Sequence, residues 1–526
     1  MNNAPSLETV IHEPGKGDTV ASLFERAASL HANSPLIFFD DASSLSYAEA
    51  LILAQRVAAG LRAMGVGRGD KVVSISAASA ESALVFWGCM LAGAVFVTID
   101  RTTENEKLTR AVEKGCPRAV FIGPEYAAWA ASHGLKAVSY QPSIDGACHA
   151  GIEQFASWLK AAPDSYRKRV VAPGDDAAII FTSGTTSEAR GVVLSHAALA
   201  GSGRLMTEAY GWGPQDRLLS AGDFHSMSGL RNPLVAVPFA GASFIVAPHA
   251  VRANAPACSE LMERLGATIL CTVPAFLAQF NLFNEKIAKG FTAALRFVMS
   301  AGTPLPDAVS RAFETLYKRP VLDYYGLTET AGLCVGVPPG MQERYRGAIG
   351  VPIGAQVRII GDDGIDAAIG EPGELLVRSR NLMSRYYLDT VATEKAFIDG
   401  WYRTRDLCFM RPDGSIELLG RVDDAFKDLR GELTYPYEIE RALERTGLVL
   451  EAAVCGFVGE DGRPGAAAFV VPREGVDIGS LEPGLKRSVL ALLGPYRTPS
   501  IFRFVDALPR CTNGKILRTK LREAFL

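Results

Sequence analysis

A loop of small hydroxyl residues is the segment best suited to hold an anion. It follows the apolar run 177–181, which is typical of a buried strand, and Ser195 is a candidate N-cap for a helix beyond it. Its N–H and O–H donors can surround a phosphate because no bulky side chain blocks the approach. Arg190 can add a charge-assisted contact, although an ordinary strand-to-helix turn is the alternative reading. The loop comprises Thr182, Ser183, Gly184, Thr185 and Thr186.

Two further loops follow predicted strands and carry groups that suit a nucleotide and its metal. The strands are expected at 296–300 and 321–325. Ligands of parallel α/β sheets collect at the carboxyl ends of the strands, where these loops lie. Tyr325 offers a flat face to a purine there, and Glu329 offers an oxygen suited to Mg²⁺. Taken singly, a tyrosine at position 325 is more often a core residue, and a glutamate at position 329 is more often a helix N-terminal charge.

The segment 223–231 contains a histidine that has two interpretations. His225 lies beside Phe224, and such a histidine is more often a packed or capping residue than a catalyst. Arg231 is close enough to recognise an acid, but a solvated surface arginine is the more ordinary expectation.

Alternating strands and helices position these loops. We expect helices at 45–64 and 82–92 and strands at 71–75, 94–98, 119–122 and 177–181. This alternation favours an α/β architecture with largely parallel sheets.

Composition excludes several classes of function. A chain of 526 residues exceeds one core, so two or more domains are expected. The formal charge of −3 predicts no nucleic-acid partner. The nine cysteines form no C-x-x-C pair and are interpreted as buried thiols in a reducing compartment. No secretory signal is visible, and the longest apolar run, 233–248, is too short to span a membrane, which favours a cytoplasmic location.

The phosphate-binding loop also carries a family resemblance. Residues 182–192 resemble T-S-G-T-T-G-x-P-K-G-V of the acyl-adenylating (AMP-forming) superfamily: acyl- and aryl-CoA synthetases, peptide-synthetase adenylation domains and luciferases. Ser187, Ala189 and Arg190 depart from that pattern. The run Y-G-L-T-E-T at 325–330 is similar to the superfamily's Y-G-x-T-E motif and is a more specific signal.

Later motifs stand in the order of the superfamily. They are D-G-W-Y-R-T-R-D at 399–406, G-R-V-D-D at 420–424, P-Y-E-I-E at 436–440 and L-P-R-C-T-N-G-K-I-L-R at 508–518. Arg405 replaces the glycine of G-W-x-x-T-G-D. One extra residue separates Lys427 from Gly431, which puts the geometry of the thiol-side loop in doubt.

The resemblance implies a fold and a role for individual residues. A large N-terminal domain (1–420) of mixed, largely parallel sheets flanked by helices precedes a small mobile α+β C-terminal domain (421–526), with Asp423 as the hinge. Lys515, Glu329 and Thr328 are the implied catalytic residues, and Glu329 binds Mg²⁺. His225, Met227 and Ala301 line the acyl pocket. ATP and AMP are bound by Thr182, Ser183, Gly184, Thr185, Thr186, Arg190, Gly302, Thr303, Asp323, Tyr324, Tyr325, Gly326, Leu327, Asp406 and Arg421.

The implied reaction is ATP-dependent activation of a small-molecule carboxylic acid to an acyl-AMP, followed by transfer to a thiol. CoA is the expected acceptor, and a phosphopantetheine arm on an acyl carrier protein is the first alternative. A nucleotide-binding relic without catalysis is the second, which the departures at Ser187, Ala189, Arg190 and Arg405 favour slightly. The protein is expected to be a monomer or homodimer.

Overall fold

The computed structural model describes residues 18–103, 105–142, 148–182, 190–459, 462–510 and 516–525. The chain forms two compact units. Unit 1 contains Met1–Gln356 and Val377–Tyr402, and unit 2 contains Val357–Leu376 and Arg403–Leu526. Each unit is described separately below.

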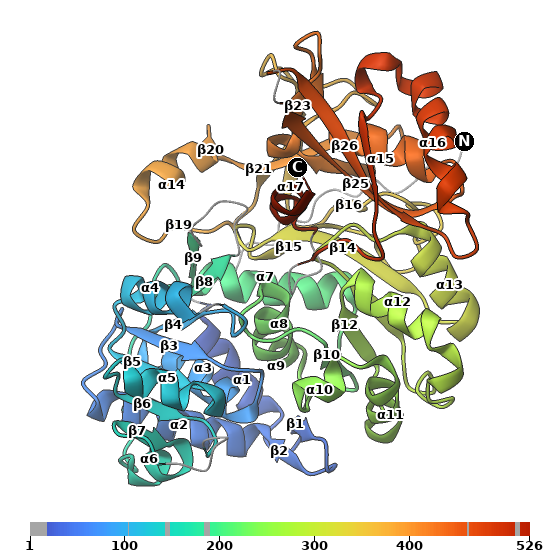
Figure 1. Cartoon of the computed structure of the whole chain (residues 1–526). Coiled ribbons are helices and arrows are strands. Elements are labelled where there is room, and N and C mark those ends of the chain that lie inside the picture. Colours follow the sequence, from blue (N-terminus) through green and yellow to red (C-terminus); the bar gives the residue numbers. More distant parts are fainter. Residues whose placement is uncertain are drawn as a thin grey trace, which may run out of the picture. The chain divides into compact units, whose positions relative to one another are not determined.

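Unit 1 contains an eight-stranded sheet built around parallel strands (Figure 1). Its order is β19-β9-β8-β4-β3-β5-β6-β7, and only β9 and β19 run antiparallel to their neighbours. Strands β3, β4 and β5 are almost wholly buried apolar runs, as expected of a sheet covered on both faces. The strands are β3 (Lys71–Ile75), β4 (Val95–Thr98), β5 (Ala119–Ile122), β6 (Ala137–Ser139), β7 (Ile152–Gln154), β8 (Asp176–Thr182), β9 (Arg190–Ser195) and β19 (Arg385–Tyr386).

A second, nine-stranded sheet of unit 1 carries most of the predicted site loops. Its order is β16-β15-β14-β13-β12-β10-β11-β1-β2, with a parallel centre and antiparallel strands at both edges. The strands are β1 (Pro35–Phe39), β2 (Ser44–Ser46), β10 (Arg217–Ser220), β11 (Ser243–Val246), β12 (Ile269–Thr272), β13 (Phe297–Ser300), β14 (Val321–Leu327), β15 (Gly332–Gly336) and β16 (Val351–Pro352).

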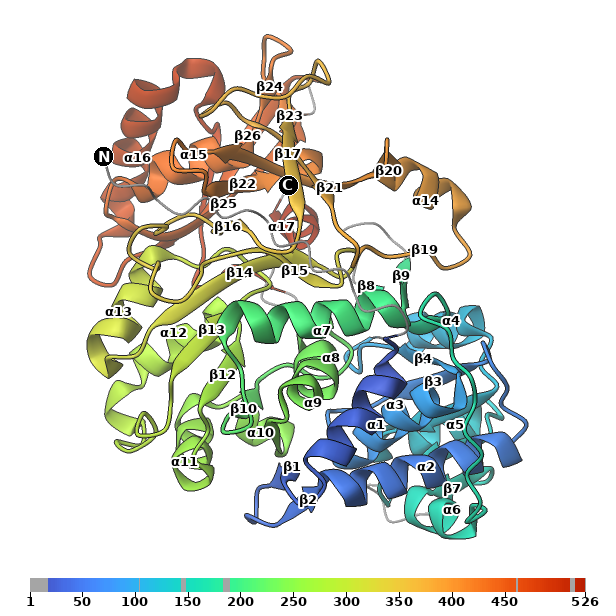
Figure 2. The same ribbon diagram turned by 180° about the vertical axis from the view of Figure 1, so that it is seen from behind.

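Helices cover these sheets, and their starts follow from local sequence. Ser46 and Glu49 form a reciprocal capping box at α2, and Ser195 caps α7 as predicted. Helix α7 contacts strands of both sheets (Figure 2). The α-helices are α1 (Val20–Leu30), α2 (Tyr47–Ala63), α3 (Ala80–Ala92), α4 (Asn105–Gly115), α5 (Ala127–Ser132), α6 (Phe155–Ala161), α7 (His196–Tyr210), α8 (Met227–Arg231), α9 (Val237–Ala240), α10 (His249–Arg252), α11 (Ala255–Leu265), α12 (Pro274–Leu282), α13 (Asp307–Tyr317) and α14 (Thr390–Ala396).

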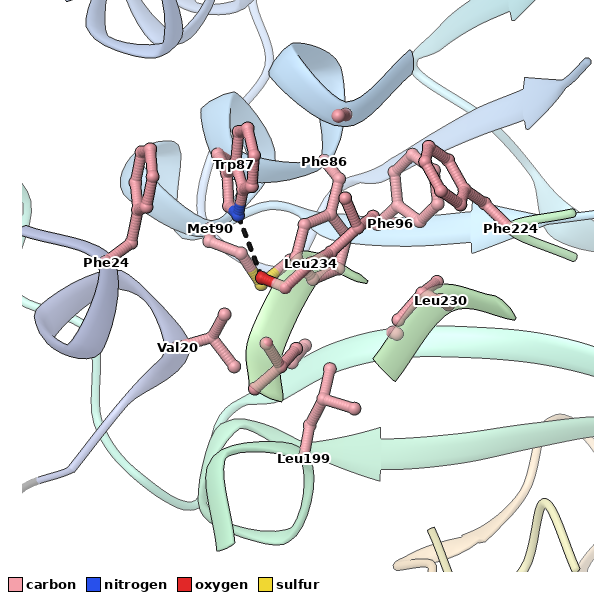
Figure 3. Close-up of a cluster of buried hydrophobic side chains, with 14 of the residues drawn as sticks. Val20, Phe24, Phe86, Trp87, Met90, Phe96, Leu199, Phe224, Leu230 and Leu234 are labelled. Atoms are coloured by element: carbon pink, nitrogen blue, oxygen red, sulfur yellow. Dashed lines mark hydrogen bonds between the residues drawn. The ribbon is translucent and has the colours of Figure 1, made fainter. Parts of the chain in front are cut away.

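Residues on either side of the segment 225–229 are packed in the hydrophobic core of unit 1. Phe24 stacks on Trp87 with ring centroids 4.4 Å apart, and the Trp87 indole N–H donates to the Leu234 carbonyl at 2.9 Å (Figure 3). Phe224 and Leu230 belong to the same buried cluster. Residues 225–229 are therefore held between two core anchors.

Unit 2 contains a three-stranded sheet with helices on both faces. The sheet has the order β25-β26-β27. Helices α15 and α16 pack on one face of it around an apolar cluster, and α17 packs on the other face (Figure 1). Its elements are α15 (Pro436–Glu444), α16 (Ile478–Leu493), α17 (Arg518–Phe525), β23 (Phe426–Lys427), β24 (Leu433–Thr434), β25 (Val449–Val458), β26 (Pro464–Pro472) and β27 (Ile501–Phe504).

A five-stranded sheet includes strands whose residues fall in both units. Strands β17, β18 and β21 each cross the boundary, so residues 357–376 and 403–420 cluster with the C-terminal residues. The expected boundary between domains 1–420 and 421–526, next to the predicted hinge Asp423, stays a prediction. The strands are β17 (Gln356–Ile360), β18 (Gly373–Arg378), β20 (Phe397–Ile398), β21 (Trp401–Met410) and β22 (Ile416–Arg421).

The predicted fold class is confirmed, with two local corrections. Strand β9 follows the phosphate loop directly, so that loop joins two antiparallel strands rather than a strand and a helix. Cys116 and Cys148 are exposed, so the interpretation of every cysteine as buried is wrong. Among the described residues, no helix is long and apolar enough to cross a membrane.

Candidate active site

Several predicted nucleotide and acyl residues of unit 1 lie at or after the carboxyl ends of neighbouring strands in the nine-stranded sheet. In the parallel register Thr272 pairs with Ser300, so β12 and β13 end side by side, and Ser300 pairs with Asp323, beyond which β14 continues to Leu327. The loop after β13 carries the predicted residues Ala301, Gly302 and Thr303. The predicted residues Gly326 and Leu327 end β14, and Thr328 and Glu329 lie in the turn that follows. Gly302 has φ +95°, a conformation that strains other residues.

A shallow, open hollow lies beside the start of β14. Its lining includes Leu305, Asp323, Val337 and Tyr345. Burial raises the pKa of Asp323 well above its usual range, opposed by a hydrogen bond from the backbone of Tyr324. A carboxyl group held in this way can remain protonated and donate a hydrogen bond.

Glu329 and Arg190 meet at a residue that the sequence did not single out. The Tyr386 hydroxyl donates to Glu329 Oε1 at 2.9 Å, and the Arg190 guanidinium lies 5.6 Å from the centre of the Tyr386 ring. Strand β19 pairs with β9, which brings Tyr386 opposite Val192. The backbone N–H of Met383 also donates to the Glu329 carbonyl at 2.7 Å. Residues distant in sequence thus form one cluster of a cation, a phenol and a carboxylate.

The turn that presents Thr328 and Glu329 is fixed by Thr330. The Thr330 hydroxyl accepts from the Leu327 N–H at 2.9 Å and donates to the Gly332 carbonyl at 2.6 Å. Glu329 is half-buried at this turn rather than at a helix N-terminus, so that alternative is excluded.

His225 and Met227 lie in the segment held by the core. His225 Nε2 is 3.6 Å from Asp100 Oδ2, and Met227 is buried behind the Ser226 N-cap of α8. Asp223 anchors this loop, accepting from Arg101 Nε at 3.0 Å and from the Ala78 N–H at 3.1 Å. Burial alone would raise the pKa of Asp223, but Arg252 and its other partners outweigh burial and lower that pKa to about 2.

Arg231 is not a surface residue, and the expectation of a solvated arginine is wrong. Its side chain is 0% exposed. Nε donates to Asn232 Oδ1 at 2.9 Å, and the two Nη atoms reach the Ser202 hydroxyl at 3.3 Å and the Tyr324 hydroxyl at 3.4 Å.

The predicted ribose residues come together within unit 2. Asp406 and Arg421 are register partners on β21 and β22, with Arg421 Nη1 2.8 Å from Asp406 Oδ1. The Asp406 N–H also donates to the Thr404 hydroxyl at 3.0 Å. Asp406 is buried, so the alternative of a solvated turn residue is wrong.

Arg405 adopts the backbone conformation that the superfamily's glycine would favour. Its φ is +59°, and its N–H donates to Glu374 Oε1 at 3.1 Å. Its guanidinium pairs with Asp423, the predicted hinge residue. The departure from glycine therefore keeps the turn and adds an ion pair.

The insertion before Gly431 is accommodated in a tight turn between β23 and β24. The fully buried carboxylate of Asp428 accepts from the N–H groups of Arg430 at 2.8 Å and Glu432 at 3.0 Å. Some predicted residues lie outside the described residues, namely Ser183, Gly184, Thr185, Thr186 and Lys515, as does the side chain of Thr182.

Two family models match the chain over most of its length. The AMP-binding enzyme family matches residues 24–387, and the C-terminal domain of AMP-binding enzymes matches residues 438–515. The chain belongs to the AMP-binding enzyme family. The predicted superfamily is thereby confirmed.

Relatives of this AMP-binding enzyme align over nearly its full length. It is 30% identical to the sulfoacetate–CoA ligase of Cupriavidus necator over 97% of this chain and 98% of that one. It is 29% identical to the 4-hydroxybenzoate–CoA/benzoate–CoA ligase of Rhodopseudomonas palustris, covering 93% and 91% of the two chains. ATP-bound MatB from Rhodopseudomonas palustris has a TM-score of 0.85 at 27% identity, with 96% and 99% covered. The prediction of an AMP-forming acid–thiol ligase is confirmed at this level.

Proposed function

We propose that this enzyme activates a small carboxylic acid with ATP, releases pyrophosphate and transfers the acyl group to CoA. The cluster of Arg190, Tyr386 and Glu329 is the observation that carries the proposal. It places a cation and a carboxylate beside strand β9, which follows the predicted phosphate loop. Activation requires that repulsion between the acid's carboxylate and the triphosphate be suppressed, which is electrostatic work.

The residues present fit a magnesium ion that is shared with the nucleotide. Glu329 Oε1 accepts from Tyr386, which orients the carboxylate and leaves its second oxygen for a cation. Within the described ranges, no three His, Cys, Asp or Glu side chains converge as a metal site. A cation held by one carboxylate, phosphates and waters is the arrangement typical of Mg²⁺. Bound there, it would neutralise charge on the phosphates.

The nucleoside has candidate positions in both units. We propose that the adenine occupies the hollow beside Asp323 and that Asp406 receives the ribose hydroxyls. Tyr325, two residues further along β14, is the predicted flat face for the purine. The Arg421 guanidinium holds the Asp406 carboxylate in place. Lys515 would contact the acid and the α-phosphate. No general base is required, because a carboxylic acid is ionised at neutral pH.

CoA is the preferred acceptor because the relatives at 28–30% identity over nearly the whole chain include several CoA ligases, although a fatty acid–acyl-carrier-protein ligase of Streptomyces coeruleorubidus is also 28% identical. A carrier-protein arm would use the same adenylate, so it remains the second candidate. The relatives' acids range from sulfoacetate to benzoate, so their names define no single substrate class.

The test is pyrophosphate release from ATP and a panel of acids, with the thioester identified by mass spectrometry. We expect release that depends on the acid, and an acyl-CoA when CoA is present. Thioester formation with holo-carrier protein but not with CoA would favour the second candidate. ATP binding by calorimetry without release from any acid would identify a non-catalytic relic.

A further inference from the structure

Among the described residues of unit 1, two arginines, Arg231 and Arg252, are fully buried, and they differ in their partners. Arg252 pairs with the carboxylate of Asp223 and donates to backbone carbonyls, including that of Ala247 at 2.9 Å. Arg231 has only the neutral oxygens of Asn232, Ser202 and Tyr324. No carboxylate pairs with Arg231 among the residues that the structure describes.

The nearby acid does not serve as the counter-ion of Arg231. Asp323 precedes Tyr324, yet burial raises the pKa of its carboxyl group and the opposing contribution is a backbone hydrogen bond, not a cation. Cys271, a neighbour, is held in its thiol form because burial raises its pKa to about 12. The surroundings of Arg231 are therefore polar but neutral.

A buried charge without a counter-charge is costly, and an arginine cannot avoid it by losing its proton. Lysine or histidine in such a place would become neutral, whereas guanidinium stays charged in proteins. Three hydrogen bonds also leave two of its five N–H donors without a described acceptor. Such a group is prepared to bind an anion that the folded chain does not itself supply.

Arg231 also lies on the same short helix as Met227, a predicted acyl-pocket residue. It follows Met227 by four residues on α8, so both side chains point to the same side of that helix. Its guanidinium is 5.7 Å from the centre of the ring of Tyr324, a residue of β14 that is also among the predicted site residues. Gly332 lies against it, since a Cβ at Gly332 would be 2.7 Å from Arg231 Nη1.

We propose that Arg231 selects a carboxylic acid with a second anionic group, a carboxylate or sulfonate, at the end opposite the activated carboxylate. The inference rests on the proposed function, whose acyl pocket it extends. The bond to the Tyr324 hydroxyl is the longest of the three, so the anion would displace that hydroxyl. Long, purely apolar acids would instead place hydrocarbon against a desolvated cation, which opposes their binding.

The test compares pairs of acids that differ only at the far end. Butanoate is matched with succinate and with 3-sulfopropanoate, and benzoate with 3-carboxybenzoate and 3-sulfobenzoate. Pyrophosphate release gives kcat/KM for each acid in the wild-type enzyme. We expect at least one anionic-tailed acid to exceed its neutral match by about 10- to 100-fold, the value of one charge-assisted pair. The carboxylate and sulfonate arms identify which anion is preferred.

Variants assign that preference to the guanidinium. Arg231→Met keeps much of the volume and removes the charge, so the ratio should fall to about one, while Arg231→Lys should retain part of it. Arg204→Met is the control, because Arg204 pairs with Asp18 elsewhere in unit 1 and should leave the ratio unchanged. If Arg231→Met does not fold, the inference is still tested by the kcat/KM ratio of anionic to neutral acids in the wild type and in Arg231→Lys.

The outcomes separate this inference from the proposed function. Release at equal or higher kcat/KM with the neutral acids overturns the inference and leaves ligase activity standing. An anionic preference that survives in Arg231→Met also overturns it. Absence of release from both members of every pair overturns the inference together with the proposed activity.

Discussion

Tyr386 contacts both Arg190, the predicted phosphate ligand, and Glu329, the predicted metal ligand. It donates to Glu329 and lies beneath the guanidinium of Arg190. Burial, together with the Glu329 charge, raises the pKa of its phenol, so the hydroxyl remains a donor over the whole physiological range. A fixed donor on one carboxylate oxygen orients the other toward a cation, as outer-sphere partners do in metal sites.

This arrangement predicts which of two substitutions, at Glu329 or at Tyr386, raises the Mg²⁺ requirement more. Glu329→Gln should raise the Mg²⁺ concentration needed for half-maximal pyrophosphate release by at least about tenfold, because an amide is a weaker ligand. Tyr386→Phe should raise it less, because only the orientation is lost. Tyr387→Phe is the matched control, since Tyr387 packs in a different cluster. An unchanged Mg²⁺ titration in Glu329→Gln would remove Glu329 from the metal site.

At the scale of elements, the strands could be predicted because their apolar runs are local. Predicted strands 71–75 and 119–122 coincide with β3 and β5, and the strand at 321–325 extends to Leu327 in β14. Strand β9 does not follow from the sequence alone, because Gly191 and Val192 match the loop motif, whereas their pairing with β8 makes them part of a strand. The partners of Glu329 could not be predicted, because Tyr386 reaches it only through the pairing of β19 with β9.

The turn at Arg405 belongs to the same scale and predicts a stability difference. Arg405 is held at φ +59°, where an L-residue is strained and glycine is not. Arg405→Ala keeps the strain and loses the pair with Asp423, whereas Arg405→Gly loses the pair but relieves the strain. We therefore expect Arg405→Gly to be more stable than Arg405→Ala by about 1 kcal/mol. Urea unfolding of both variants measures this, and an alanine variant as stable as the glycine variant would contradict it.

At the scale of the whole molecule, buried groups link stability to pH. His196 is fully buried at the start of α7, and within the described part of the chain neither ring nitrogen has a hydrogen-bond partner. Burial lowers the pKa of His196 to about 4. The unfolded chain therefore binds a proton more readily than the native state, so stability should fall as pH drops from about 6.5 to about 4.

This linkage predicts a pH-dependent effect of His196→Leu. Over that interval one site contributes a loss of order 3 kcal/mol in the wild type, and the variant should lack this contribution. Near pH 7.5 the variant should be at least as stable, because the buried ring nitrogens are unpaired. Unfolding free energies at several pH values test this, with exposed His133→Leu as the control. Parallel pH profiles for the wild type and His196→Leu would show that His196 is not the source.

Burial of charged side chains could not be predicted from the sequence, because it depends on the whole fold. Arg231 is expected from the sequence to be a solvated surface residue, yet α7, β14 and β15 enclose it. Asp406 reads as a turn residue, yet pairing of β21 with β22 buries it against Arg421. Motif order identified the family, whereas the neighbours of each residue required the structure.

The C-terminal residues 438–515 form a separate family match, which ends at Lys515. If this part turns about Asp423 between the two half-reactions, Lys515 should matter in only one of them. Lys515→Ala should slow acyl-AMP formation by about 10²- to 10⁴-fold, through loss of one charge on the reacting groups, and spare thioester formation from supplied acyl-AMP. Asp423→Pro should do the reverse, because proline fixes φ at the pivot and restricts the preceding residue. Asp423→Ala also breaks the pair with Arg405 but leaves φ free, so it separates the effect of the ion pair from that of rotation. Each half-reaction is measured alone on each variant, and equal losses in both for Lys515→Ala would show that the lysine is structural or that no rotation occurs.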